Sequence, residues 1–299
     1  MREIAIVIGR GHARAGSTRL RGFQLARLCA ESAAGTGHEV RLRWHDEPIA
    51  GALGIVHKSV LLPPYRDALP RLRAAGCLLL IDFLDMLVRP GLARQADGFI
   101  ACSRAQAAHL REAYPGRPVI DLPHHADLDI PESPGTWDAW RCGYFGDPAN
   151  TAHLDAVVAA GLVIAWATPV RDENGWRAAL ARHNLHYAVR PRSMLGGRFK
   201  PFTKGMLAAR VGAVAVVDES DEEAMALLGA DYPFAMPADC DAATLVQRLS
   251  EMRSGFGDAA WQLARSRMEP LRRIGSAAHQ VALLREALFG EGPVASWLR

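Results

Sequence analysis

Short apolar runs alternate with amphipathic segments through the first 125 residues. The apolar runs are four to six residues long, which is typical of strands buried in a parallel sheet. Between them, apolar positions recur at the spacing of one helix face. We expect strands over Glu3–Ile8, Glu39–Trp44, Gly54–His57, Cys77–Ile81, Gly98–Ala101 and Val119–Leu122, and helices over Leu20–Ala33, Tyr65–Ala75 and Arg104–Ala113. This alternation predicts a doubly wound sheet, whose ligands bind beyond the C-terminal ends of the strands.

The alternation breaks at Pro123–Asp127, is interrupted by Pro131, Pro134 and Gly135, and then resumes. We expect strands over Arg141–Phe145, Leu162–Ala167, His186–Val189, Ala213–Val217 and Tyr232–Met236, helices over Thr151–Ala160, Gly175–Arg182, Thr203–Arg210 and Asp221–Leu228, and a helical tail from Asp241. The sequence therefore predicts an α/β protein with two Rossmann-like domains, 1–125 and 126–299, facing each other across a cleft. The C-terminal helices are assigned to the second domain.

Composition narrows the class of protein. The chain has 299 residues, 49% of them hydrophobic, which is enough for two cores. A net charge of +3 does not favour nucleic acid as a partner. The five cysteines form no CxxC pair and indicate reduced thiols in a cytoplasmic protein. The N-terminus indicates a strand and not a signal peptide, and no apolar run is long enough to span a bilayer, although the composition is compatible with peripheral contact at the inner membrane surface.

Positive charge is unevenly distributed along the chain. There are 32 Arg and three Lys, and no acidic residue lies between Glu173 and Asp218. Within that stretch, a glycine pair precedes a predicted helix start that carries Arg198, Lys200, Thr203 and Lys204. The free N–H groups of a helix N-terminus favour a phosphate, and two lysines four residues apart share one face of a helix. The segment from Gly197 to Gly229 is therefore our candidate for an anion site, with a basic surface patch as the alternative.

The next strand ends in a run of acids, in which Glu222 and Glu223 begin a helix. Acidic residues at this position commonly cap a helix and interact with its dipole. They also lie at the strand end where a carboxylate could hold a sugar or ribose hydroxyl. Both interpretations stay open.

Three residues of the first half are candidates for a general base. His57, Asp82 and Asp85 lie at the ends of two predicted strands, on the rim where ligands bind. Asp82 is also placed to cap the helix that follows.

The loop after the first strand contains glycines, but not at GxGxxG spacing, so a dinucleotide site is not predicted. Ser17, Arg19 and Arg21 in this loop are candidates to hold an acceptor or the donor phosphate, and a solvated basic loop is the alternative. His124 and His125 lie in the boundary segment without a suitable further set of ligands, so no metal is predicted.

Several of these motifs resemble bacterial glycosyltransferases of the GT-B type (group 1-like). The segment Lys200-Pro201-x-Thr203-Lys204, with Ala208-Ala209-x-x-Gly212-Ala213 and Glu223-Ala224-x-x-Leu227-Leu228-Gly229, is similar to their donor site. Weaker likenesses are Gly143-Tyr144-Phe145-Gly146 to the first strand and loop of their second domain, Leu122–Asp127 to their crossover, Ala96–Ser103 to a first-domain strand, and Ser17-x-Arg19-x-Arg21 to their basic loop. Asp82 and Asp85 fall where many members carry acids.

The resemblance implies a GT-B-like fold, with the acceptor on the first domain and the donor on the second. It implies transfer of a sugar from a nucleotide-diphosphate sugar to a hydroxyl of a glycan or glycoconjugate, as in polysaccharide biosynthesis, without a metal or a resident cofactor. It also implies a donor-site role for Gly146.

The sequence departs from the family pattern at two positions. Two glutamates common in enzymes that retain anomeric configuration are replaced by Phe199 and Leu207. A non-catalytic nucleotide-sugar-binding protein and a nucleotide-sugar epimerase therefore stay open as alternatives, and the sequence does not determine the stereochemistry or the oligomeric state.

Overall fold

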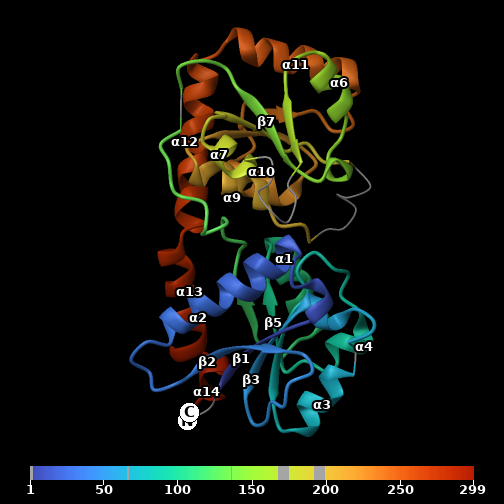
Figure 1. The fold of residues 1–299 in the computed structure, drawn as a ribbon, viewed down its shortest axis with the longest axis vertical. Coiled ribbons are helices and arrows are strands. Elements are labelled where there is room, and N and C mark those ends of the chain that lie inside the picture. The colour runs from blue at the N-terminus through green and yellow to red at the C-terminus, as the bar shows by residue number, and fades with distance from the viewer. Residues whose placement is uncertain (1–2, 66, 136, 168–174, 192–198) are drawn as a thin grey trace. The chain divides into compact units, whose positions relative to one another are not determined.

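The structure is a computed structural model that describes residues 3–65, 67–135, 137–167, 175–191 and 199–299. The chain divides into two compact units (Figure 1). Unit 1 comprises Met1–His124, Phe199–Pro201 and Ala277–Arg299, and unit 2 comprises His125–Arg198 and Phe202–Ser276. Each unit is built on its own parallel sheet.

The sheet of unit 1 has six parallel strands in the order β2-β1-β3-β4-β5-β6. The strand order reverses between β1 and β3, so the C-terminal ends of these two strands flank the crevice where such sheets bind ligands. The strands are β1 (Ile4–Ile8), β2 (Val40–Trp44), β3 (Leu53–His57), β4 (Leu78–Asp82), β5 (Gly98–Ala101) and β6 (Val119–Asp121).

Helices cover both faces of this sheet because alternate side chains of each strand point to opposite faces. Ala5 and Val7 of β1 join a core with Leu69 and Leu110, from the helices that connect the later strands. The helices of unit 1 are α1 (Gly16–Thr18), which continues through a π-helical turn (Arg19–Gln24) into α2 (Leu25–Ser32), then α3 (Ala68–Ala74), α4 (Pro90–Ala93), α5 (Arg104–Ala113), α13 (Ala277–Phe289) and α14 (Pro293–Ser296). Helix α13 packs against α2, and Arg285 Nη2 donates to the Ala34 carbonyl at 3.2 Å.

The sheet of unit 2 has five parallel strands in the order β11-β10-β9-β7-β8. Here the strand order reverses between β7 and β9. The strands are β7 (Cys142–Gly146), β8 (Ile164–Ala167), β9 (Leu185–Tyr187), β10 (Val214–Asp218) and β11 (Ala235–Met236).

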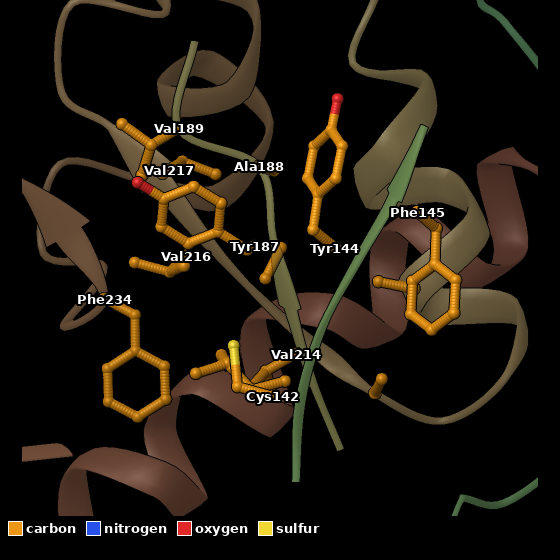
Figure 2. Close-up of a cluster of buried hydrophobic side chains, with 14 of the residues drawn as sticks. Cys142, Tyr144, Phe145, Tyr187, Ala188, Val189, Val214, Val216, Val217 and Phe234 are labelled. Atoms are coloured by element: carbon orange, nitrogen blue, oxygen red, sulfur yellow. The ribbon is translucent and has the colours of Figure 1, made fainter. Parts of the chain in front are cut away.

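Side chains from both faces of these strands are buried in unit 2. Figure 2 shows that Tyr144 and Phe145, which are adjacent on β7, project to opposite sides of the strand. Helix α9 packs against α12, whose Trp261 is fully buried among aromatic rings. The helices among the described residues of unit 2 are α6 (Leu154–Ala159), α7 (Trp176–Leu180), α9 (Thr203–Arg210), α10 (Glu222–Leu228), α11 (Ala242–Ser254) and α12 (Ala259–Ile274).

The expected fold class, two parallel α/β sheets with C-terminal helices, is confirmed. The C-terminal helices are divided differently from the sequence-based domains 1–125 and 126–299. Helices α11 and α12 belong to unit 2, whereas Ala277–Arg299 returns to unit 1. No helix among the described residues is long and apolar enough to cross a membrane, and all five cysteines are free.

Candidate functional site

The reversal of strand order in unit 2 marks one candidate site. Strand β7 ends at Gly146, and β9 is followed by a segment that leads to Arg190. Lys204 lies in the first turn of α9, with its Nζ 4.9 Å from the centre of the Tyr144 ring. Gly146 lies so close to both that a Cβ atom built on it would stand 2.9 Å from Tyr144 Oη and 3.4 Å from Lys204 Nζ. The strand end, an aromatic ring and a cation therefore meet at the edge where ligands of such sheets bind.

The N-terminus of α9 adds backbone donors to this site. Its N-cap is Phe202, which has no side-chain oxygen and makes no capping hydrogen bond. The first-turn N–H groups therefore gain no acceptor from the capping residue, and the helix dipole is positive at this end. Thr203, as predicted, lies in the first turn and is partly exposed. Arg198, predicted to act here, lies outside the described residues.

The expected pairing of Lys200 with Lys204 on one helix face is wrong. Helix α9 begins at Thr203, so Lys200 and Pro201 precede it instead of forming its first turn. Lys200 belongs to unit 1 and Lys204 to unit 2. The N-cap Phe202 folds its buried ring against Gly205, where a Cβ atom would lie 2.0 Å from the ring.

A buried ion pair lies at the neighbouring strand end of unit 2. Arg190 Nη1 stands 3.3 Å from Asp221 Oδ2, and the two side chains are 9% and 3% exposed. Burial raises the pKa of Asp221, and the charge of Arg190 opposes that rise. Asp221 also caps α10 by accepting from the Ala224 N–H at 3.1 Å. Arg190 lies in the stretch between Glu173 and Asp218 that has no acidic residue, but no role for it was predicted from the sequence. Its position just after β9 is the signal that could have identified it.

The two glutamates predicted beside the donor differ in their surroundings. Glu222 is exposed at the start of α10, whereas Glu223 is buried. Asp218, at the end of β10, is buried and its Oδ1 accepts from the N–H of Ser220 at 2.8 Å. Of these acids, Glu222 is the one with a carboxylate open to solvent.

In unit 1, the predicted base Asp82 and the predicted acceptor ligand Arg21 bind each other. Arg21 Nε donates to Asp82 Oδ2 at 2.8 Å, and the side chains are 0% and 1% exposed. Arg21 Nη1 also donates to the Leu122 carbonyl at 3.0 Å. Both side chains are therefore buried and paired with each other instead of facing a ligand, and their predicted roles stay predictions. The sequence could not show that the helix after β1 turns Arg21 inward onto β4.

His57, the second predicted base, is also buried. Its Nδ1 accepts from the Ser59 N–H at 3.1 Å and lies 2.8 Å from Ser59 Oγ, which in turn accepts from the Gly9 N–H at 2.9 Å. Burial, with nearby Lys58 and Arg21, lowers the pKa of His57 to about 3. The ring is therefore neutral, and its basic nitrogen is already bonded. In this structure His57 caps the turn after β3, and its base role stays a prediction.

The same contacts account for the glycine-rich loop after β1. The Gly11 N–H donates to Tyr65 Oη at 3.0 Å, while the Gly9 N–H is taken by Ser59. A Cβ atom on Gly9 would lie 3.0 Å from both the Ser59 carbonyl and the Tyr65 ring. The glycines thus permit close packing within unit 1, and their N–H groups are used internally.

The third predicted base, Asp85, lies between two ammonium groups. Its Oδ1 is 2.5 Å from Lys58 Nζ and its Oδ2 is 2.9 Å from Lys200 Nζ. Burial opposes ionisation, but Lys58 and Lys200 together hold the pKa of Asp85 well below its usual range. A carboxylate with so low a pKa is a weak base. The arrangement instead fixes two cations at the end of β3.

The remaining predicted residues are Ser17 and Arg19, which are partly exposed at the start of the helical segment after β1. Among the described residues, no group of three or more His, Cys, Asp or Glu side chains is arranged to hold a metal ion.

No protein-family model matches the sequence, and no curated protein matches it. Solved structures do match its fold. A glycosyltransferase from Rickettsia africae ESF-5 has a TM-score of 0.61 and 8% identity, with 97% of this chain and 99% of that chain covered. The lipopolysaccharide outer core galactosyltransferase WaaB has a TM-score of 0.57 and 8% identity, covering 97% of this chain and 100% of that one. The pneumococcal O-GlcNAc transferase GtfA, in complex with UDP and GlcNAc, has a TM-score of 0.56 and 9% identity, covering 83% and 57%. The likeness shows the fold, which matches structures of GT-B glycosyltransferases.

Proposed function

We propose that the chain is a glycosyltransferase that moves a sugar from a nucleotide-diphosphate sugar to a hydroxyl acceptor, with the donor bound by unit 2. The observation that carries this proposal is the position of Lys204. It lies in the first turn of α9, beside the end of β7, where the strand order reverses. The similarity of the fold to nucleotide-sugar glycosyltransferases makes a diphosphate the anion of choice.

Lys204 and the N-terminus of α9 would hold the diphosphate and stabilise the charge that develops on it as the glycosidic bond breaks. Gly146 lets the donor approach the end of β7, because a side chain there would meet Tyr144 and Lys204. Glu222, at the exposed start of α10, would accept hydrogen bonds from ribose or sugar hydroxyls. No metal is needed in this scheme, since the fixed positive charges of the chain neutralise the leaving group.

A second function has one observation in its favour. Where many retaining enzymes carry two glutamates, Phe199 is buried and Leu207 packs against the core of unit 2. Neither position offers a carboxylate, so a protein that binds a nucleotide sugar without turnover is the alternative.

Binding of UDP, GDP and ADP, measured by calorimetry, tests the donor site. We expect one of them to bind the native chain and Lys204→Ala to weaken that binding by roughly 10- to 100-fold, as for a lost hydrogen bond to a charged group. Arg248→Ala, which removes an exposed cation elsewhere in unit 2, is the matched control and should bind normally. Equal affinity in the native and Lys204→Ala chains would refute the donor site.

Release of nucleoside diphosphate from the corresponding nucleotide sugars separates the two functions. A transferase releases it, with slow hydrolysis when water replaces the acceptor. Binding without any release, with or without cell-derived glycan acceptors, would favour the non-catalytic alternative.

A further inference from the structure

We propose that Lys58 and Lys200 form a phosphate-binding subsite in unit 1, which receives a phosphate group carried by the acceptor. The proposal rests on the function proposed above, because it names the chemical class of that enzyme's acceptor. It begins from the charge of the cluster: two ammonium groups share one carboxylate, Asp85, and leave a net charge of +1.

Each ammonium has three N–H donors, and one is directed at Asp85. The remaining donors have access to solvent, because the Lys58 and Lys200 side chains are 21% and 28% exposed. A phosphate presents several oxygens and up to two negative charges, so it can accept from both lysines at once. A ligand with a single carboxylate would only duplicate Asp85, which already pairs with both lysines.

The cluster is held in place by its surroundings. Asp85 follows Leu84, a non-glycine residue with φ of 51° in the left-handed region. Such strain persists only where neighbouring groups impose it, and it is frequent at ligand sites. Here the Leu84 N–H donates to Asp82 Oδ1 at 3.1 Å, and the buried Gln106 donates to the Leu84 carbonyl at 2.5 Å.

Lys200 is fixed by a different set of contacts. The carbonyl of the preceding Phe199 accepts from Ser103 Oγ at 3.3 Å, and its ring packs 5.1 Å from that of His109. The short segment Phe199–Pro201 is thereby anchored on unit 1. The two lysines therefore come from distant parts of the sequence and are held at one strand end. A simple surface ion pair would not need this support.

The choice of lysine supports a phosphate ligand. The chain has 32 Arg and three Lys, and the exposed pairs Arg10–Asp46, Arg73–Asp97 and Arg111–Asp121 in unit 1 use arginine. Arginine matches a carboxylate with its planar fork, whereas lysine is a compact charge that readily binds phosphate. Leu87, two residues after Asp85, is 70% exposed, and the comparison of octyl phosphate with inorganic phosphate tests for an alkyl chain on the ligand.

Calorimetric titration with octyl phosphate, inorganic phosphate and octanol at fixed ionic strength tests the subsite. The full chain carries Lys204→Ala in every arm, so that the contribution of the site in unit 2 is reduced and is the same in all variants. We expect octyl phosphate to bind and octanol not to bind. The added substitutions Lys58→Gln and Lys200→Gln, which keep a hydrogen-bond donor for Asp85, should weaken octyl phosphate binding at least tenfold. Arg111→Gln, which removes an exposed cation of unit 1, is the control.

The two phosphate arms distinguish the source of the ligand. Octyl phosphate binding at least tenfold more tightly than inorganic phosphate indicates a lipid-borne acceptor, and equal binding indicates a soluble one. Unchanged octyl phosphate binding in the Lys58→Gln/Lys200→Gln chain, or equal binding of octanol, overturns the proposal.

A separate titration with the diphosphate that binds the native chain assigns the subsite to acceptor or donor. With Lys204 intact, the Lys58→Gln/Lys200→Gln chain should retain its affinity for that diphosphate, and a tenfold loss would place the lysines in the donor site instead. If no diphosphate binds the native chain, the donor site proposed in unit 2 has failed. The octyl phosphate titration still reports on the two lysines by themselves.

Discussion

The buried ion pair between Arg21 and Asp82 can be tested against the base role that the sequence predicted for Asp82. Replacing Asp82 by Asn keeps the shape of the side chain and an acceptor for the Leu84 N–H, but leaves the Arg21 guanidinium buried without its counter-charge. Breaking a buried ion pair on one side costs about 3–5 kcal/mol. For a unit of about 150 residues, each kcal/mol lowers the melting temperature by roughly 2–4 °C. The expected drop for unit 1 is therefore about 6–20 °C.

Differential scanning calorimetry measures this change, because it resolves separate transitions if the two units unfold independently. Arg21→Met/Asp82→Asn should recover part of the loss, since the double variant leaves no unpaired charge. Arg111→Gln, at an ion pair whose side chains are 52% and 57% exposed, should cost less than about 1 kcal/mol. An Asp82→Asn chain that keeps its melting temperature but loses sugar transfer would refute this reasoning and restore Asp82 as the base.

Two further predictions concern stability. Gly9→Ala should destabilise unit 1 by about 1–3 kcal/mol in chemical denaturation, because the added methyl meets the Ser59 carbonyl and the Tyr65 ring. Gly16→Ala, with nothing within 4 Å of the new atom, is its control, and equal stability of the two variants would contradict the packing argument. In unit 2, burial lowers the pKa of His186 from 6.5 to about 3. The unfolded chain therefore binds a proton first as pH falls, and stability should decline by up to about 1.4 kcal/mol per pH unit between pH 6.5 and pH 3. His186→Phe should reduce that slope in acid unfolding experiments, and an unchanged slope would exclude this residue as its source.

Most of the secondary structure was predictable from the periodicity of apolar positions, although some bounds differ: the helix expected over Tyr65–Ala75 spans Ala68–Ala74, and the strand expected over Tyr232–Met236 is Ala235–Met236. The strand Gly98–Ala101 and the helices Arg104–Ala113 and Thr203–Arg210 begin and end where the pattern placed them. The destination of the C-terminal helices was not predictable. An amphipathic helix shows that one face is buried, but not which sheet it covers, and Ala277–Phe289 returns to α2.

The candidate site was predictable only as a set of strand ends. The sequence placed His57 and Asp85 at one rim, because parallel strands end at the same edge, and Lys58, the residue after His57, pairs with Asp85 there. It could not distinguish a side chain that faces solvent from one turned inward. His57 and Asp82 are the last residues of β3 and β4, at this rim, and both are nonetheless buried. Helical spacing failed for Lys200 because α9 begins at Thr203, so Lys200 lies outside the helix.

The central claim is that the donor diphosphate binds at the N-terminus of α9. A crystal structure of the full chain with UDP, or with whichever diphosphate binds more tightly, tests it most directly. We predict phosphate oxygens within about 3 Å of Lys204 Nζ and of first-turn N–H groups of α9, next to Gly146. A diphosphate bound elsewhere, with Lys204 still beside the Tyr144 ring and making no contact with it, would contradict the account.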